Sequence, residues 1–149
     1  MSHTVVALES ASAAHLRAGG TSVVVDLTAQ PAPAIIHWGP DLGALDDETL
    51  SSMAVAARPQ RVSGGIDQTP RLTIVPTAAA GWPGAPGYEG GCGGVVQGTV
   101  FSLASVDSTP DAVTLHLVDE QRALRLRAEL RVDAAGLFSQ KLTVVNDGA

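Results

Sequence analysis

The chain has one cysteine, few cations and no long apolar run, and each shortage excludes a class of protein. Its single cysteine, Cys92, excludes an internal disulfide framework and a cysteine-cluster metal site. Only 9 Lys and Arg stand against 15 Asp and Glu, and the net charge of −6 argues against nucleic acid and anionic membranes as partners. No apolar stretch approaches the roughly 20 residues that span a bilayer, and no signal-peptide pattern begins the chain. We therefore expect a cytoplasmic protein.

What remains is the composition of one globular domain. Hydrophobic residues make up 45% of the 149 positions and charged residues 16%, which is not the composition of a disordered chain. A domain of this length buries roughly two-thirds of the surface that its unfolded chain exposes. We therefore expect a single folded domain with a substantial apolar core.

Aromatic residues are also scarce, and their placement is unusual. The chain has 2 Trp, 1 Tyr and 2 Phe, yet Trp82 and Tyr88 both fall in the segment GWPGAPGYEGGCGG, residues 81–94. Glycine and proline exclude regular structure there, so this loop either folds back onto its own domain or contacts another surface. Cys92 has no neighbouring base or cation in this segment, and we expect an inert thiol.

The clearest structural pattern lies near the C-terminus. Residues 124–132 alternate strictly between apolar and polar side chains, which indicates a half-buried β-strand. Its polar side carries Arg125, Arg127 and Arg131 with Glu129 between them. This stripe is either an anion-binding face or, more simply, the solvated outer face of a sheet.

Similar patterns elsewhere predict an all-β chain. Apolar, β-branched runs bounded by Gly, Pro and Asp are typical of short antiparallel strands. The predicted strands are Val5–Leu8, His15–Ala18, Thr21–Leu27, Ala34–Trp38, Leu72–Val75, Val95–Leu103, Val113–Val118, Leu124–Val132 and Leu137–Val145. Gly19-Gly20 supplies the turn of one hairpin. The count predicts an antiparallel β-sandwich.

One helix interrupts the strands. Leu50, Met53, Ala54 and Ala57 recur at the spacing of one helical face. We expect Asp47 as the N-cap, and Pro59 stops the run.

The last residues of the chain have the composition of a turn. Asn146-Asp147-Gly148 follows the last predicted strand and favours a hairpin turn, which delivers a further strand. We expect the chain to be truncated inside a larger sheet; the alternative is a frayed natural terminus.

Patterns that carry chemistry are absent from the sequence. His3, His15, His37 and His116 show no metal-ligand spacing, and no nucleophile motif is present. Asp46, Asp47 and Glu48 are accounted for by helix capping. Asp41 and Glu89 are a conceivable pair for glycoside hydrolysis, although nothing in the sequence sets their separation. We therefore expect no catalytic residues, no metal and no cofactor.

Two segments that combine glycine with an aromatic residue do carry a resemblance. Residues 35–43, IIHWGPDLG, are similar to the LHWGADLG segment of actinobacterial family 36 α-galactosidases. Residues 72–76, LTIVP, with residues 81–87, GWPGAPG, resemble that family's LLPE…GWxGRPGL segment. The order and approximate spacing are the family's, and the resemblance covers essentially the whole chain, most specifically residues 16–43 and 72–88.

The resemblance implies that the catalytic residues lie in a different domain of a larger protein. In that family this region is an N-terminal β-supersandwich domain, followed by a catalytic (β/α)8 barrel that holds the nucleophile and acid/base aspartates. Residues 1–149 would then be a non-catalytic part of a larger glycoside hydrolase, which retains configuration and needs no cofactor. The implied partners are the barrel, an α-galactoside bound by the parent enzyme, and further copies of the chain.

The candidate substrate-binding residues are Trp82, Tyr88, Trp38 and Asp41. Aromatic faces stack on the C–H patches of sugars, and a carboxylate accepts hydrogen bonds from hydroxyls. For Trp82 and Tyr88 the alternative is a loop packed over the sandwich or the barrel, and Trp38 directly ends a predicted strand. Two other functions stay open: a freestanding carbohydrate-binding module and a purely structural oligomerisation domain.

Overall fold

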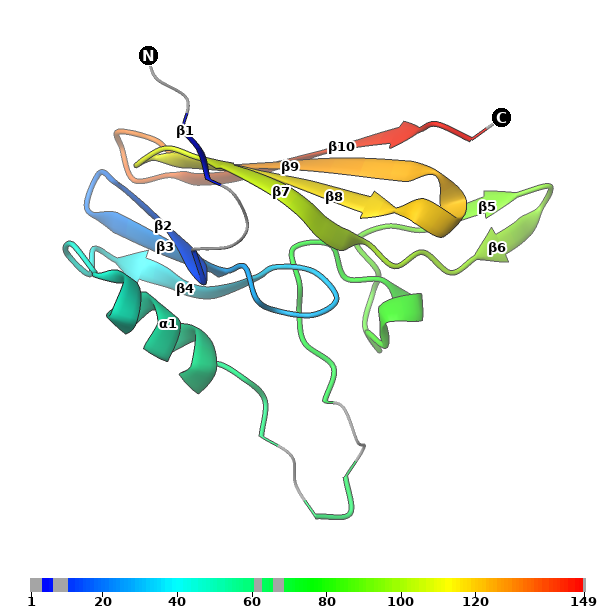
Figure 1. The fold of residues 1–149 in the computed structure, drawn as a ribbon, viewed down its shortest axis with the longest axis horizontal. Coiled ribbons are helices and arrows are strands. Elements are labelled where there is room, and N and C mark those ends of the chain that lie inside the picture. Colours follow the sequence, from blue (N-terminus) through cyan, green and yellow to red (C-terminus); the bar gives the residue numbers. More distant parts are fainter. Residues whose placement is uncertain (1–3, 7–10, 61–62, 66–68, 149) are drawn as a thin grey trace.

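The fold consists of two antiparallel sheets and a small hairpin in this computed structural model (Figure 1), which describes residues 4–6, 11–60, 63–65 and 69–148. The large sheet has the order β1-β7-β8-β9-β10 and the small sheet the order β2-β3-β4. The strands of the large sheet are Thr4–Val6, Ser102–Ser108, Ala112–Asp119, Leu124–Val132 and Phe138–Asn146. The small sheet comprises Ala13–Ala18, Thr21–Asp26 and Ala34–Pro40, and the hairpin β5–β6 comprises Gly90–Cys92 and Val95–Gln97.

The predicted β-sandwich is confirmed, because the two sheets pack face to face. Strand β2 contacts β8 and β9, and β3 contacts β9. The inner-face side chains of β8 and β9 are almost fully buried: Val113, Leu115, Leu117, Leu126, Ala128, Leu130 and Val132. Burial of this apolar face holds the two layers together.

The central strand of the small sheet, β3, is buried on both faces. Val23 and Val25 lie in the core between the sheets, while Val24 faces outward. Helix α1, Asp47–Ala56, covers that outer face by packing Leu50 against Val24. No helix in the described part of the chain is long and apolar enough to cross a membrane.

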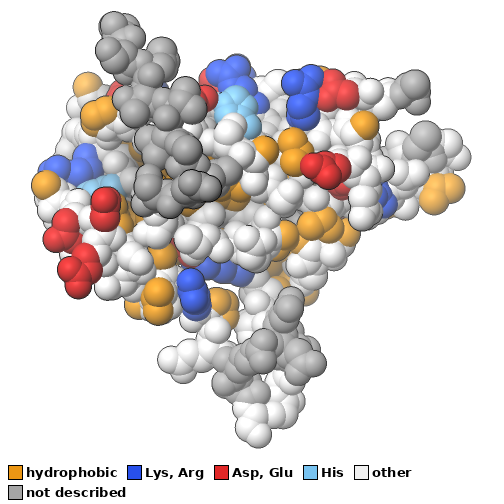
Figure 2. Space-filling view, in the orientation of Figure 1, with side chains coloured by type: hydrophobic (Ala, Val, Ile, Leu, Met, Phe, Trp, Pro, Cys, Tyr) orange, Lys and Arg blue, Asp and Glu red, His pale blue; other side chains and the backbone are white. Residues whose placement is uncertain are grey.

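The helix begins one residue earlier than the sequence suggested. Asp46, and not Asp47, is the N-cap, and its carboxylate accepts a hydrogen bond from the Thr49 amide at 2.8 Å. Asp47 and Glu48 instead occupy the first turn, where a negative charge suits the helix dipole. Figure 2 shows acidic side chains gathered at the left, where α1 begins.

Glycine lets two turns of different sheets meet. Gly19 and Gly20 have φ of 54° and 76°, as the predicted two-residue hairpin requires. A side chain at Gly19 would lie 2.1 Å from the backbone nitrogen of Gly136 in the β9–β10 turn. The β2–β3 turn therefore packs directly against the β9–β10 turn.

Two predicted strands are wrong. Leu72–Val75 is not a strand, although Ile74 and Val75 are buried; Pro70 and Pro76 flank this segment and remove ladder donors. The segment forms single hydrogen bonds instead, from the Ile74 amide to the Pro33 carbonyl and from Gln140 Nε2 to the Ile74 carbonyl, both at 2.9 Å.

The predicted strand Val95–Leu103 is two strands, β6 and β7. The chain turns between them so that Thr99 and Phe101 become buried. Of predicted Val5–Leu8, residues 4–6 form β1, and residues 7–10 lie outside the described part.

The inner face of strand β10 is only partly covered. It pairs with β9 in an unbroken nine-residue register, and its inner face carries Phe138, Leu142 and Val144. Yet Leu142 and Val144 remain 37% and 40% exposed. The small sheet has only three strands and lies beneath the left part of the large sheet (Figure 1), so it does not reach the whole of β10.

Candidate functional site

The loop that carries Trp82 is fixed by its own backbone. Thr77 caps the short helix η1, Ala78–Ala80, and the Trp82 amide donates to the Thr77 carbonyl at 3.3 Å. The Gly87 amide closes the loop on the Pro76 carbonyl at 2.7 Å. The Thr77 hydroxyl donates to the Thr99 carbonyl at 2.6 Å, which ties the loop to the chain entering β7.

The Trp82 indole is held by the same loop. Its Nε1 donates to the Ala85 carbonyl at 3.1 Å, and a side chain at Gly84 would lie 2.8 Å from that nitrogen. Glycine at position 84 therefore permits the close approach of backbone and indole. Glycine at position 84 is thus explained by the seating of the indole.

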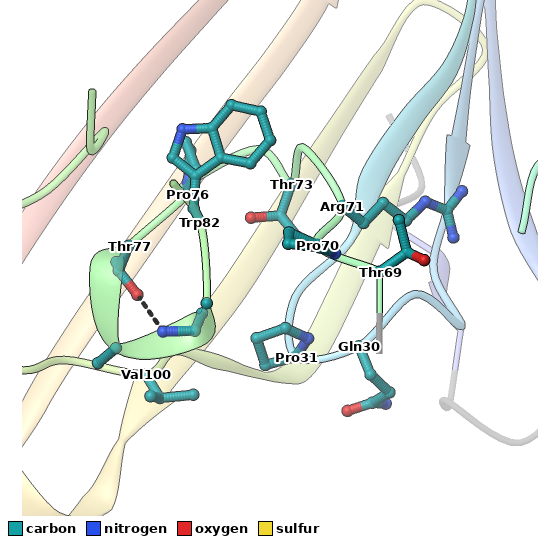
Figure 3. Close-up of a pocket in the computed structure, with 13 residues that line it drawn as sticks. Gln30, Pro31, Thr69, Pro70, Arg71, Thr73, Pro76, Thr77, Trp82 and Val100 are labelled. Atoms are coloured by element: carbon teal, nitrogen blue, oxygen red, sulfur yellow. Dashed lines mark hydrogen bonds between the residues drawn. The ribbon is translucent and has the colours of Figure 1, made fainter. Parts of the chain in front are cut away.

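The indole forms part of the wall of a pocket of about 500 Å³ (Figure 3). The lining residues are Gln30, Pro31, Thr69, Pro70, Arg71, Thr73, Pro76, Thr77, Ala79, Ala80, Gly81, Trp82 and Val100. Figure 3 shows the Thr73 hydroxyl turned toward the Trp82 side of the pocket. The described lining residues are mixed in chemistry, with one indole, three proline rings, one amide, one guanidinium and three threonine hydroxyls, and none of them carries a carboxylate or an imidazole.

A buried ion pair anchors one wall of this pocket. Asp26 at the end of β3 is fully buried and accepts hydrogen bonds from the amide and hydroxyl of Thr28 at 2.8 and 2.7 Å. Its second oxygen accepts from Arg71 Nη1 at 2.9 Å. The Arg71 guanidinium accordingly points away from Trp82 in Figure 3. The pair fastens the 69–77 segment to the small sheet.

Tyr88 belongs to the core rather than to the Trp82 pocket. Its ring is half-buried and packs edge-on against Phe101, with ring centroids 5.5 Å apart and an interplanar angle of 73°. A side chain at Gly90 would lie 2.6 Å from the Tyr88 hydroxyl. Tyr88 lines a separate hollow of about 200 Å³ next to Asn146.

Trp38 lies on the inner face of β4, at the margin of the sandwich. Its indole is 64% exposed and contacts Phe138 of β10, with ring centroids 5.2 Å apart. This aromatic pair bridges the edge strands of the two sheets. It is continuous with the uncovered inner face of β10.

Asp41 is part of a polar network on the outer face of the small sheet. Its carboxylate accepts from Arg17 Nε and Nη2 at 2.7 and 2.8 Å, from the Ser22 hydroxyl at 3.0 Å, and from the Gly43 amide at 3.0 Å. These donors, the Arg17 guanidinium first, hold the pKa of Asp41 well below its usual range. His15 completes the network through a 2.9 Å hydrogen bond between its Nε2 and the Ser22 hydroxyl.

The four predicted sugar-contacting residues thus lie in separate places. Trp82 lines one pocket, Tyr88 another, Trp38 contacts Phe138, and Asp41 lies over the β2–β3 turn. Glu89 directly precedes β5, at the opposite end of the molecule from that turn in Figure 1. The two carboxylates therefore do not face each other across a cleft, as a glycosidase pair must.

The other polar residues singled out in the sequence have structural partners. On the outer face of the large sheet Arg125 pairs with Asp147, Arg127 with Glu129, and Arg131 with Asp111, so the stripe is a solvated, charge-balanced surface. His116 pairs with Asp107 at 3.0 Å. Residues described in the structure include no group of three metal-ligating side chains. The Cys92 side chain and His3 lie outside what the structure describes.

Several residues of the two polar sites were missed from the sequence. Gln30, Arg71 and Thr73 in the Trp82 pocket come from irregular segments with no periodic pattern. Arg17, Ser22 and His15 were assigned only to strands. The alternation of side chains along β2 and β3 was a signal for this site. Residues two apart share one face of a sheet, so the polar residues on the outer face of β2 and β3 could be expected near Asp41.

Comparison with protein-family models, with curated proteins and with solved structures found no match to the chain.

Proposed function

We propose that the chain is a non-catalytic, N-terminal-type β-sandwich domain of an α-galactosidase-like glycoside hydrolase, in which Trp82 contributes to the rim of the galactoside-binding site. The resemblance of residues 35–43 and 72–88 to family 36 supplies the substrate class. The hydrolytic carboxylates would belong to the barrel of the parent enzyme.

The Trp82 pocket is the observation that carries this proposal. Its volume of about 500 Å³ lies in the range of small-molecule sites, and a fixed indole suits the C–H face of a pyranose. Gln30 and Thr73 supply an amide and a hydroxyl for sugar hydroxyls. Glycoside hydrolysis needs two carboxylic groups, and none of the described residues that line this pocket carries one. These lining residues are suited to contact a sugar.

The uncovered inner face of β10 supports the structural part of the proposal. Trp38 contacts Phe138, and the exposed Leu142 and Val144 extend this apolar margin along the same face of β10, with Gln140 between. Monomeric domains seldom leave a large apolar patch uncovered. This margin is where the domain would contact the barrel or another copy of the chain.

A galactoside titration tests the binding role. In a Trp38→Phe background Trp82 is the only tryptophan, so its fluorescence reports the pocket alone. We expect methyl α-galactoside to change that fluorescence saturably. Trp82→Ala is expected to remove the part of the calorimetric heat of binding that comes from this pocket in the wild-type background.

Gly84→Ala provides a sharper variant of the same test. The added methyl group would lie 2.8 Å from the Trp82 Nε1 and would displace the indole while leaving the core untouched. Gly39→Ala, whose added methyl would make only an ordinary 3.4 Å contact with the His37 ring and whose φ is not positive, is the matched glycine control. Unchanged sugar binding in Gly84→Ala, or a flat titration of the wild type, would contradict the proposal.

A further inference from the structure

The polar network around Asp41 contains a fully buried hydroxyl that determines where its protons lie. The Ser22 hydroxyl accepts from the Leu42 amide at 3.0 Å and contacts Asp41 Oδ1 at 3.0 Å and His15 Nε2 at 2.9 Å. An ionised carboxylate only accepts, so the single Ser22 proton goes to Asp41. His15 Nε2 must then be the donor to Ser22.

This assignment makes the other ring nitrogen of His15 an acceptor, and no residue in the described part of the chain donates to it. In a neutral imidazole protonated at Nε2, the Nδ1 atom carries a lone pair. Burial, followed by the nearby Arg17 charge, lowers the pKa of His15, which favours the neutral ring at neutral pH. The opposing influence is Asp41, and His37 adds a further lowering contribution.

Asp41 retains a second acceptor. Its Oδ1 already receives three hydrogen bonds, from Arg17, Ser22 and Gly43. Among the described residues its Oδ2 receives one hydrogen bond, from Arg17 Nη2, and a carboxylate oxygen can accept two. The two bonds of Arg17 to Asp41 use Nε and Nη2, and no described residue pairs with its Nη1.

These groups surround one shallow hollow, here called the Asp41 hollow. It has a volume of about 320 Å³ and is lined by His15, Arg17, Ala18, Gly19, Gly20, Asp41 and Pro110. The charges of Arg17 and Asp41 cancel and His15 is neutral, so neither an anion nor a cation is favoured there. No aromatic ring lines the hollow, which leaves hydrogen bonding as the means of recognition.

We infer that the Asp41 hollow is a second binding site, for a neutral polyhydroxyl ligand such as a hexose or a cyclitol. Adjacent hydroxyls of such a ligand can donate to Asp41 Oδ2 and His15 Nδ1 and accept from Arg17. Ser22 is the positioning residue that orients both acceptors from beneath. The hollow shares no lining residue with the Trp82 pocket, so this inference stands independently of the proposed function.

Histidine side-chain nitrogen resonances in the full chain provide the test. We expect methyl α-galactoside or myo-inositol, at millimolar concentration, to shift the His15 Nδ1 resonance saturably. His116, which pairs with Asp107 on the large sheet, serves as an internal control and should not move. Sulfate is the counter-probe, and it should not shift His15.

Two substitutions locate the site. Asp41→Asn removes a charge-assisted acceptor and should weaken binding about tenfold. Asp111→Asn, in the exposed ion pair with Arg131, is the matched control and should bind as the wild type does. If Asp41→Asn fails to fold, Arg17→Lys is the second variant. It keeps the positive charge but loses the bidentate hydrogen bonding to Asp41, and it should weaken binding similarly.

The outcomes separate this inference from the proposed function. Binding at His15 that survives Trp82→Ala supports two independent sites. The inference would be overturned if neither polyol shifts the His15 Nδ1 resonance, or if sulfate shifts it instead. Either result counts independently of the Trp82 titration.

Discussion

Strands β9 and β10 are neighbours of equal length and both carry apolar side chains on the inner face, yet the inner face of β9 is buried and that of β10 is largely open. The inner face of β9 has Ala128 and Leu130 at 0% and 1% exposure. Directly beside Ala128, Leu142 of β10 is 37% exposed. Both strands are paired without a bulge, so hydrogen bonding does not distinguish them.

The difference comes from the opposite layer. Strands β2 and β3 of the small sheet contact β8 and β9, whereas β10 is contacted by Gln140's partner Ile74 in the irregular 69–77 segment and by Trp38. An apolar face in a sequence therefore indicates a surface suited to burial, while the number of strands opposite decides whether it is buried. The predictions below test this contrast.

Truncation within β9 should have the largest effect. Leu130→Ala removes a side chain that is 1% exposed and leaves a cavity between the sheets. We expect the free energy of unfolding to fall by about 3 kcal/mol, measured by urea denaturation. A loss below about 1 kcal/mol would mean that the layers are not tightly packed at this point.

The same truncation on β10 should cost much less. Leu142→Ala deletes a side chain that already contacts water, so we expect a loss below about 1 kcal/mol by urea denaturation. A cost equal to that of Leu130→Ala would show that another surface covers β10 in solution. Light scattering on the same samples would then identify a second copy as that surface.

Acid should weaken the small sheet through Asp41. Its pKa lies lower in the folded chain than in the unfolded chain, so its ion pair stabilises the fold above the unfolded pKa of about 4. This contribution is lost as the pH falls from about 4 toward the folded pKa. We expect thermal melts between about pH 6 and pH 3 to show a smaller loss of melting temperature for Asp41→Asn than for the wild type. Equal losses would contradict the assigned ion pair.

The smallest effect is expected on the outer face of the large sheet. Arg131→Ala breaks an exposed 3.4 Å ion pair with Asp111 and should change the free energy of unfolding by less than about 0.5 kcal/mol. Urea denaturation measures this change. A loss above about 1 kcal/mol would show that the stripe is more than a solvated face.

Much of the fold was predictable because its strands carry local signals. Alternation gave the bounds of β9 as Leu124–Val132 without error, and Gly19-Gly20 gave the hairpin turn. The prediction failed at Leu72–Val75, where an apolar run is buried without a strand partner. Burial there depends on Pro33 and Gln140, which lie far away in the sequence.

The candidate sites were less accessible from sequence. Trp82 was identified from its unusual setting, whereas its pocket is completed by Gln30 and Arg71 from distant irregular segments. Asp41 was identified, but its partners Arg17 and Ser22 are strand residues whose side chains meet only through the β2–β3–β4 register. Sequence indicated single residues, and the fold determined which of them share a site.

The central claim is that this domain contacts a galactoside without cleaving it, and one titration tests both parts. The pure chain carrying Trp38→Phe is mixed with p-nitrophenyl α-galactoside while Trp82 fluorescence and p-nitrophenolate absorbance are followed together. We predict a saturable fluorescence change with no release of p-nitrophenolate. Release by the pure chain, or fluorescence that does not respond to the sugar, would contradict the account.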